Sequence, residues 1–64
     1  MNILDFYKII SDDVKVEIIN KEEDIRYYYG KICDVPIKYL GLVIRHIAAL
    51  YIHGYDSIEY IIYV

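Results

Sequence analysis

The sequence predicts an α+β fold with a short N-terminal helix and a small, bent antiparallel sheet of about four strands. Three observations predict this class. Apolar residues near the start recur at helical spacings, later segments alternate apolar and polar residues, and polar turn residues separate these segments. Because the chain has only 64 residues, we expect a single domain spanning 1–64.

Residues 2–10 are expected to form the helix. Ile3, Phe6 and Ile10 follow one another at spacings of three and four, which places them on one helical face. Asn2 can cap the first turn, and the carboxylate of Asp5 suits the positive end of the helix dipole. The Ser-Asp-Asp triplet that follows ends the helix, because these side chains compete for backbone hydrogen bonds.

A hairpin is predicted next. In residues 14–19, valine and isoleucine alternate with lysine and glutamate, which indicates a strand with one buried and one solvated face. Residues 20–24 are polar and form the loop, and residues 25–32 return as the second strand. On this strand Ile25, Tyr27 and Tyr29 are expected on one face. Arg26 and Tyr28 are expected on the other, with a bulge or bend near Gly30.

Residues 37–52 allow two interpretations. Apolar residues recur at helical spacings through this segment, which favours one long helix. Gly41 in its interior and several β-branched residues favour a single helical turn over 37–40 and a strand from about 42 to 52. The residues alone leave both open. Residues 54–57 then predict a turn, and 58–64 a final strand.

The final strand is largely apolar on both faces. One face carries Ile58, Tyr60, Ile62 and Val64, and the other carries Glu59, Ile61 and Tyr63. Such a strand is either central in the sheet or covered on its second face by another chain.

Composition and charge exclude several classes of protein. The net charge is −3 and no basic cluster occurs, which argues against nucleic acid as a partner. No uncharged run approaches the roughly 20 residues of a membrane-spanning helix, so we expect no membrane association. Asp5 and Lys8 argue against a signal peptide, and Cys33 is a lone cysteine, so we expect a cytoplasmic location in the host cell.

No residue pattern indicates chemistry. His46 and His53 lack the four-residue spacing of a helical zinc pair. Cys33 precedes a possible helix start, which can lower a thiol pKa, but no Gly-rich oxyanion loop accompanies it. The glycines form no phosphate-binding loop. We therefore expect no catalytic residue, no metal and no other cofactor, so the protein is predicted not to be an enzyme.

Tyrosine is the unusual feature of the composition. Hydrophobic residues make up 58% of the chain, but nine of them are tyrosines, and the aliphatic share is ordinary. Core packing accounts for about half of the tyrosines, and a protein interface is the better explanation for the rest. The predicted contact residues lie in a turn or opposite the expected core face: Tyr28, Tyr55, Ile61 and Tyr63. A domain this small is also marginal alone, which favours a homo-oligomer.

Several short motifs follow one another along the chain: Ile10-Ser11-Asp12-Asp13, Val14-Lys15-Val16-Glu17-Ile18, Tyr29-Gly30-Lys31, Asp34-Val35-Pro36, Tyr39-Leu40 and Val43-Ile44-Arg45-His46-Ile47. Their order resembles a group of very short uncharacterised proteins carried by phages and prophages of low-GC Firmicutes. The similarity extends over nearly the whole chain, and the chain departs from the pattern at Cys33 and Gly41. The resemblance implies a sheet compatible with a small SH3-like or Sm-like barrel, and it favours a strand after residue 42.

The resemblance implies a phage accessory role. We therefore expect a non-catalytic protein that binds a host protein, as an inhibitor of a host defence system would. One alternative is an oligomeric sponge that sequesters a small nucleotide, with Arg26 or Arg45 facing its phosphate. Another is a subunit of the virion or of its assembly.

Overall fold

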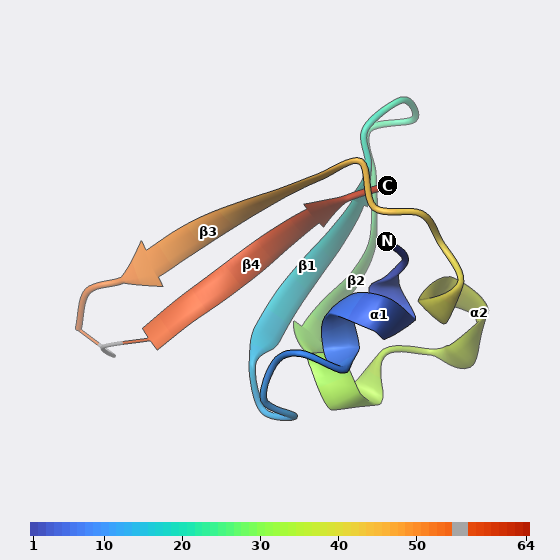
Figure 1. Ribbon diagram of the computed structural model, residues 1–64. Helices are drawn as coiled ribbons and strands as arrows, with labels where there is room; N and C mark the ends of the chain where they lie inside the picture. The colour runs from blue at the N-terminus through green and yellow to red at the C-terminus, as the bar shows by residue number, and fades with distance from the viewer. Residues whose placement is uncertain (55–56) are drawn as a thin grey trace.

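The computed structural model describes residues 1–54 and 57–64, and in them two short helices accompany a four-stranded sheet (Figure 1). This confirms the α+β class. The elements in chain order are α1 (Ile3–Tyr7), β1 (Lys15–Asn20), β2 (Ile25–Lys31), the 3-10 turn η1 (Ile32–Asp34), α2 (Ile37–Leu40), β3 (His46–Ile52) and β4 (Ser57–Tyr63). Among these residues no helix is long and apolar enough to cross a membrane.

The sheet is mixed, with the strand order β2-β1-β4-β3. Its two outer pairs, β1 with β2 and β3 with β4, are antiparallel as predicted. The central pair of β1 and β4 is parallel, so the sheet is mostly but not wholly antiparallel. A parallel pair needs a long crossover, and the chain from β2 through α2 and β3 supplies it. Alternation of residues reports faces and carries no information on strand direction.

The segment after Pro36 follows the second of its two interpretations. α2 is one short turn, and the strand β3 begins at His46, four residues later than expected. The intervening chain pairs instead with the N-terminus. Val43 forms an isolated bridge with Asn2, and the Ile44 amide donates to the Met1 carbonyl at 2.9 Å.

The helix α1 is short and well capped. The Asn2 side chain accepts a hydrogen bond from the Asp5 amide at 2.9 Å, and the Asp5 carboxylate accepts one from the Asn2 amide at 3.1 Å. This reciprocal capping box satisfies two amides that no helical carbonyl can reach. The helix ends at Tyr7, before the predicted end at residue 10.

Both helices lie on the same face of the sheet. The core lies between the helices and this face. The ring of Phe6 meets the ring of Tyr60 edge-on, with centroids 5.5 Å apart. Tyr39 of α2 stacks on Tyr27 of β2 at 5.2 Å. Both are partly buried against the core. The fully or almost fully buried side chains of the described residues are Ile3, Phe6, Val16, Ile18, Ile32, Val35 and Ile62.

A β-bulge in β2 changes which tyrosines reach this core. Ile18 pairs with Tyr28, but its neighbour Ile19 pairs with Arg26, so Tyr27 is an extra residue without a partner in the register. The faces predicted for this strand are therefore wrong on one side of the bulge. Tyr28 lies on the core side with Ile18, and Arg26 and Tyr29 share the opposite face.

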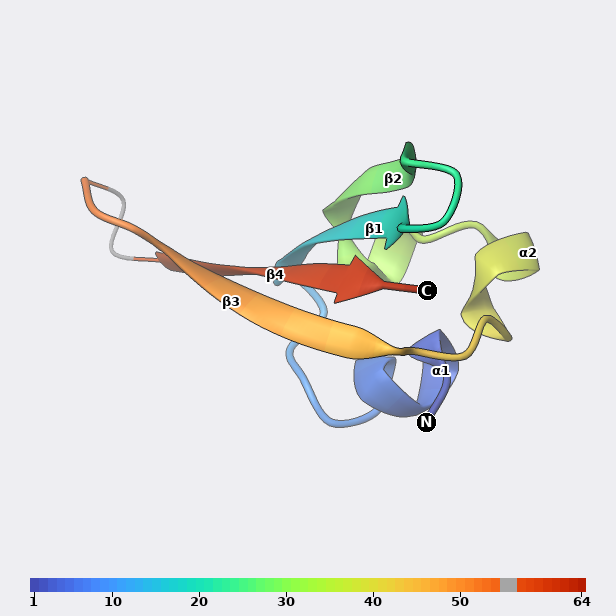
Figure 2. The ribbon, with the colours of Figure 1, turned by 90° about the horizontal axis from the view of Figure 1, so that it is seen from above.

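β3 and β4 extend as a two-stranded ribbon beyond the helices (Figures 1 and 2). β1 pairs with β4 only from Tyr60 to Tyr63, so the first residues of β4 have β3 as their only partner strand among the described residues. Where β1 pairs with it, β4 is a central strand of the sheet. A central position is one of the two explanations that the sequence offered for a strand with two largely apolar faces.

Candidate interaction surface

Among the residues that the structure describes, no helix covers one face of the sheet, and we call it the open face (Figure 2). Its residues alternate with those of the core along each strand, as the register requires. Glu17 and Tyr29 are paired across β1 and β2, Glu17 and Ile61 across β1 and β4, and His46 and Tyr63 across β3 and β4. By this register the strand residues on the open face are Lys15, Glu17, Ile19, Arg26, Tyr29, Lys31, His46, Ala48, Leu50, Ile52, Ser57, Glu59, Ile61 and Tyr63.

A polar network crosses one part of the open face. The Tyr29 hydroxyl lies 3.0 and 3.1 Å from the two carboxylate oxygens of Glu59 and donates its proton to this carboxylate. Arg26 forms an ion pair with Glu17 at 3.1 Å, and its guanidinium lies 5.7 Å from the centre of the Tyr29 ring. The hydrogen bond to Glu59 is the main cause that raises the pKa of Tyr29. This network fixes the positions of four side chains.

An aromatic cluster occupies another part of the open face. His46 and Tyr63 stack with their ring centroids 5.9 Å apart, and the Lys21 ammonium lies 5.5 Å from the centre of the Tyr63 ring. Ile61 precedes this cluster on the open face and is partly buried. Flat aromatic rings beside an aliphatic side chain, ringed by polar groups, are typical of protein interfaces.

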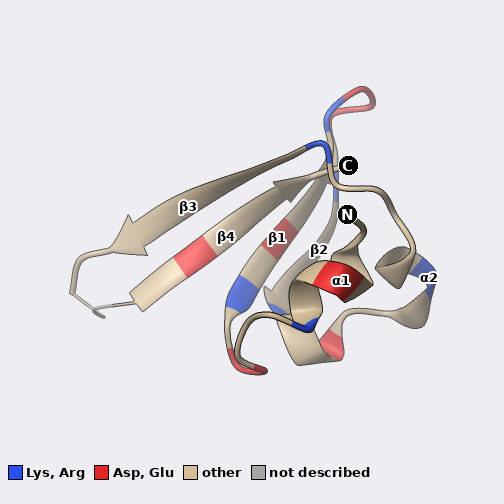
Figure 3. Cartoon of the chain, in the orientation of Figure 1, with Lys and Arg blue, Asp and Glu red and all other residues tan. Residues whose placement is uncertain are grey.

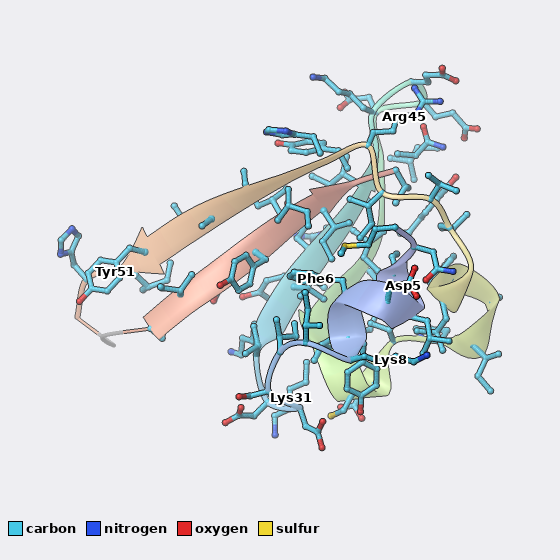
Figure 4. The ribbon with its side chains drawn as sticks, viewed as in Figure 1. Asp5, Phe6, Lys8, Lys31, Arg45 and Tyr51 are labelled. Atoms are coloured by element: carbon cyan, nitrogen blue, oxygen red, sulfur yellow. The ribbon has the colours of Figure 1, made fainter. Side chains whose placement is uncertain are left out.

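The projecting ribbon adds exposed apolar area. Leu50, Tyr51 and Ile58 are each nearly half exposed, at 48%, 47% and 48%. Figure 4 shows Tyr51 at the far end of the ribbon, away from Phe6 and the helices. Leu50 lies on the open face, and Tyr51 and Ile58 are paired on the other.

The structure brings together only part of the predicted contact set. Ile61 and Tyr63 share the open face, as predicted. Tyr28 lies on the other side of the sheet, packs against the core and donates its hydroxyl to the Lys31 carbonyl at 2.7 Å. Tyr55 lies outside the described residues.

The two predicted ligand arginines are both engaged by acids. Arg26 pairs with Glu17, and Arg45 pairs with Glu22 of the β1–β2 loop at 3.2 Å. Figure 4 shows Arg45 beside this loop, before the start of β3. Each ion pair must open before its arginine can bind a phosphate fully.

A cleft of about 800 Å³ opens where β1 and β4 diverge. The lining includes Asp13 and Lys15 from β1 and its approach, Ser57 and Glu59 from β4, and Tyr29. Two carboxylates against one ammonium give the cleft an acidic balance, which disfavours phosphate-bearing ligands.

The other chemical candidates remain apart. Desolvation and the Asp34 carboxylate raise the pKa of the Cys33 thiol, which disfavours the nucleophilic thiolate. His53 lies against the Tyr51 ring, at the opposite end of β3 from His46. In the part of the chain that the structure describes, no group of three histidines, cysteines or carboxylates could hold a metal ion.

Sequence reasoning placed Glu59 on the same face as Ile61 and Tyr63, but it missed Tyr29, His46 and Leu50 as members of the surface. Alternation along β3 identifies His46 and Leu50 once this segment is known to be a strand. Tyr29 could not be paired with Arg26 from the sequence, because only the bulge places them on one face. Comparison with protein-family models, curated proteins and solved structures found no match.

Proposed function

We propose that this protein works by binding another protein through its open face, without catalysis. The main observation for this proposal is that Ile61, Tyr63 and His46 form an aromatic and aliphatic cluster on a sheet face that no described helix covers. Tyrosine binds partners well because it offers a large ring, a polar tip and few rotatable bonds. The network of Tyr29 with Glu59 supports such binding by holding polar groups in fixed positions beside the cluster.

We further propose a host protein as the partner, in the manner of a small phage inhibitor of a host defence system. Support for this finer proposal comes from the resemblance to short phage and prophage proteins. A face that combines an aromatic and aliphatic cluster with a polar network can block a target by occupying its surface, and this needs no catalytic group.

The test is affinity capture from bacterial host lysate, with quantitative mass spectrometry of the bound proteins. Three forms are compared: wild type, the double variant Ile61→Ser/Tyr63→Ala, and a control, Ile37→Ser. Ile37 is 86% exposed on α2, on the helical side of the sheet. We expect one stoichiometric host protein with wild type and control, reduced at least about tenfold with the double variant.

The alternatives give different results in the same experiment. Nucleotide released by heating the purified protein, without a protein partner, would support the sponge. Capture of virion proteins alone would support the assembly role. A host protein bound equally by the wild type and the double variant would contradict binding through the open face.

A further inference from the structure

The outer edge of β3 is unprotected, unlike the other edge of the sheet. β3 is the last strand in the order β2-β1-β4-β3, so no described strand pairs with its outer side. Its register with β4 runs from His46 to Ile52 without a bulge. Edge strands are normally protected by charges, prolines or bulges, because free backbone groups recruit other strands. β2, at the other edge of the sheet, is protected in two of these ways. It has a bulge at Tyr27 and carries the charged residues Arg26 and Lys31.

The same strand carries no formal charge. Residues 46–52 read His-Ile-Ala-Ala-Leu-Tyr-Ile, with no aspartate, glutamate, lysine or arginine. Figure 3 shows β3 free of charged residues, while acids and bases lie on α1, β1, α2 and the loops. Two copies of a chain with net charge −3 repel each other, and an uncharged edge is where their approach costs least.

We infer that a second copy of this chain pairs with β3, antiparallel and two-fold symmetric about Ala49. In this register Ile47 lies opposite Tyr51 of the second copy, and Ala48 lies opposite Leu50. Aromatic and β-branched residues make favourable cross-strand pairs, and here each pair occurs twice. At the axis Ala49 meets itself, and its small, exposed side chain permits close approach.

The pairing covers surface that a single copy leaves exposed. Leu50 and Tyr51, each nearly half exposed, gain neighbours from the second copy. The two four-stranded sheets join into one, with both sets of helices on one side and both open faces on the other. Because each copy contributes one strand edge, we expect the contact to bury less than the about 1,200 Å² of standard interfaces and to dimerise in the micromolar range.

A charge-exchange experiment tests the register at its axis. Sedimentation equilibrium over about 10 µM to 1 mM follows the mass of the wild type, of Ala49→Glu, of Ala49→Lys and of their equimolar mixture. Like charges oppose each other at the axis in each single variant, so both are expected at 7.6 kDa. The wild type and the mixture are expected to reach twice that mass. Ile37→Glu, which adds the same charge far from the edge, is expected to dimerise like the wild type.

Disulfide trapping gives an independent reading of the register. In a Cys33→Ser background, Ala49→Cys is expected to form a covalent dimer on oxidation, since directly paired Cα atoms lie about 4.5–5.5 Å apart. Leu50→Cys is offset by two residues from its own symmetry mate, at about 7–8 Å, and is expected to cross-link poorly. A wild type that is monomeric throughout overturns the inference and leaves the edge for an extended peptide of another protein. Dimers that survive both Ala49 charges, or equal trapping at both positions, also overturn it.

Discussion

Tyr28 lies directly opposite Ile18 on the covered face of the sheet, although alternation along β2 predicts it on the open face. The single extra residue at Tyr27 causes this reversal, and both tyrosines consequently pack against the core. The bulge thereby leaves Arg26 and Tyr29 to build the polar part of the open face with Glu17 and Glu59.

The packing of Tyr28 over Gly30 predicts an asymmetry between two glycines. Gly30 has a φ of +155°, and a Cβ there would lie 2.7 Å from the Tyr28 hydroxyl oxygen and 3.1 Å from its ring. We expect Gly30→Ala to lower the free energy of unfolding by about 2 kcal/mol. Gly41, with φ of −85° and open space around it, is the control. Gly41→Ala is expected to be neutral or stabilising by about 0.5 kcal/mol. Urea denaturation measures both, and equal effects would contradict the packing account.

The hydrogen bond between Tyr29 and Glu59 predicts a titration. The Glu59 carboxylate disfavours tyrosinate, so Glu59→Gln is expected to lower the pKa of Tyr29 toward its ordinary value. Folding raises the pKa of Tyr29 above its ordinary value of about 10. The contribution of the protonated Tyr29 hydroxyl to the free energy of unfolding is therefore complete below about pH 10, and it is lost as the pH rises through the pKa of the folded state. NMR titration of ¹³Cζ-labelled tyrosine follows the change, with Tyr29→Phe to assign the signal. If the pKa of Tyr29 is the same in Glu59→Gln as in the wild type, the hydrogen bond to Glu59 does not raise it, and this prediction is wrong.

The open face is expected to tolerate truncation without loss of fold. Ile61 and Tyr63 lie opposite the core, so Ile61→Ser/Tyr63→Ala should leave the far-UV circular dichroism nearly unchanged. Ile62, fully buried between them, is the matched contrast: Ile62→Ala is expected to cost about 2–5 kcal/mol. If the double variant unfolds as Ile62→Ala does, those side chains act as core and the interface proposal loses its basis.

The capping box of α1 predicts a modest, specific effect on stability. Asn2→Ala removes the acceptor for the Asp5 amide and is expected to cost about 1 kcal/mol by thermal or urea denaturation. Asn2→Ser retains a capping oxygen and is expected to restore most of that loss. No difference between the two variants would mean that the cap contributes little to the fold.

Much of the fold could be predicted because local patterns determine it. Helical spacing and the Asn2 cap located α1, and alternation located β1, β2 and β4 to within about two residues. The parallel pairing of β1 with β4 could not be predicted, because it depends on contacts between segments far apart in the sequence. The start of β3 was also missed, since the chain just before it pairs with the N-terminus: Leu42 accepts from the Ile3 amide, Val43 forms a bridge with Asn2, and Ile44 donates to Met1.

The candidate surface was predicted only where the regular two-residue alternation of a strand holds. Ile61 and Tyr63 lie on an unbroken strand, where the two-residue period holds, and both reach the open face. Tyr28 lies beyond a bulge, where that period shifts by one residue. Nothing in the letters Tyr27-Tyr28-Tyr29 marks which of the three is the extra residue.

The most direct test of binding through the open face is photo-cross-linking in bacterial host cells. A benzophenone amino acid replaces Tyr63 in one variant and Ile37, on the helical side, in another. We predict that irradiation yields a discrete adduct with a host protein from position 63 and none from position 37. An adduct from position 37, with none from position 63, would contradict the proposal.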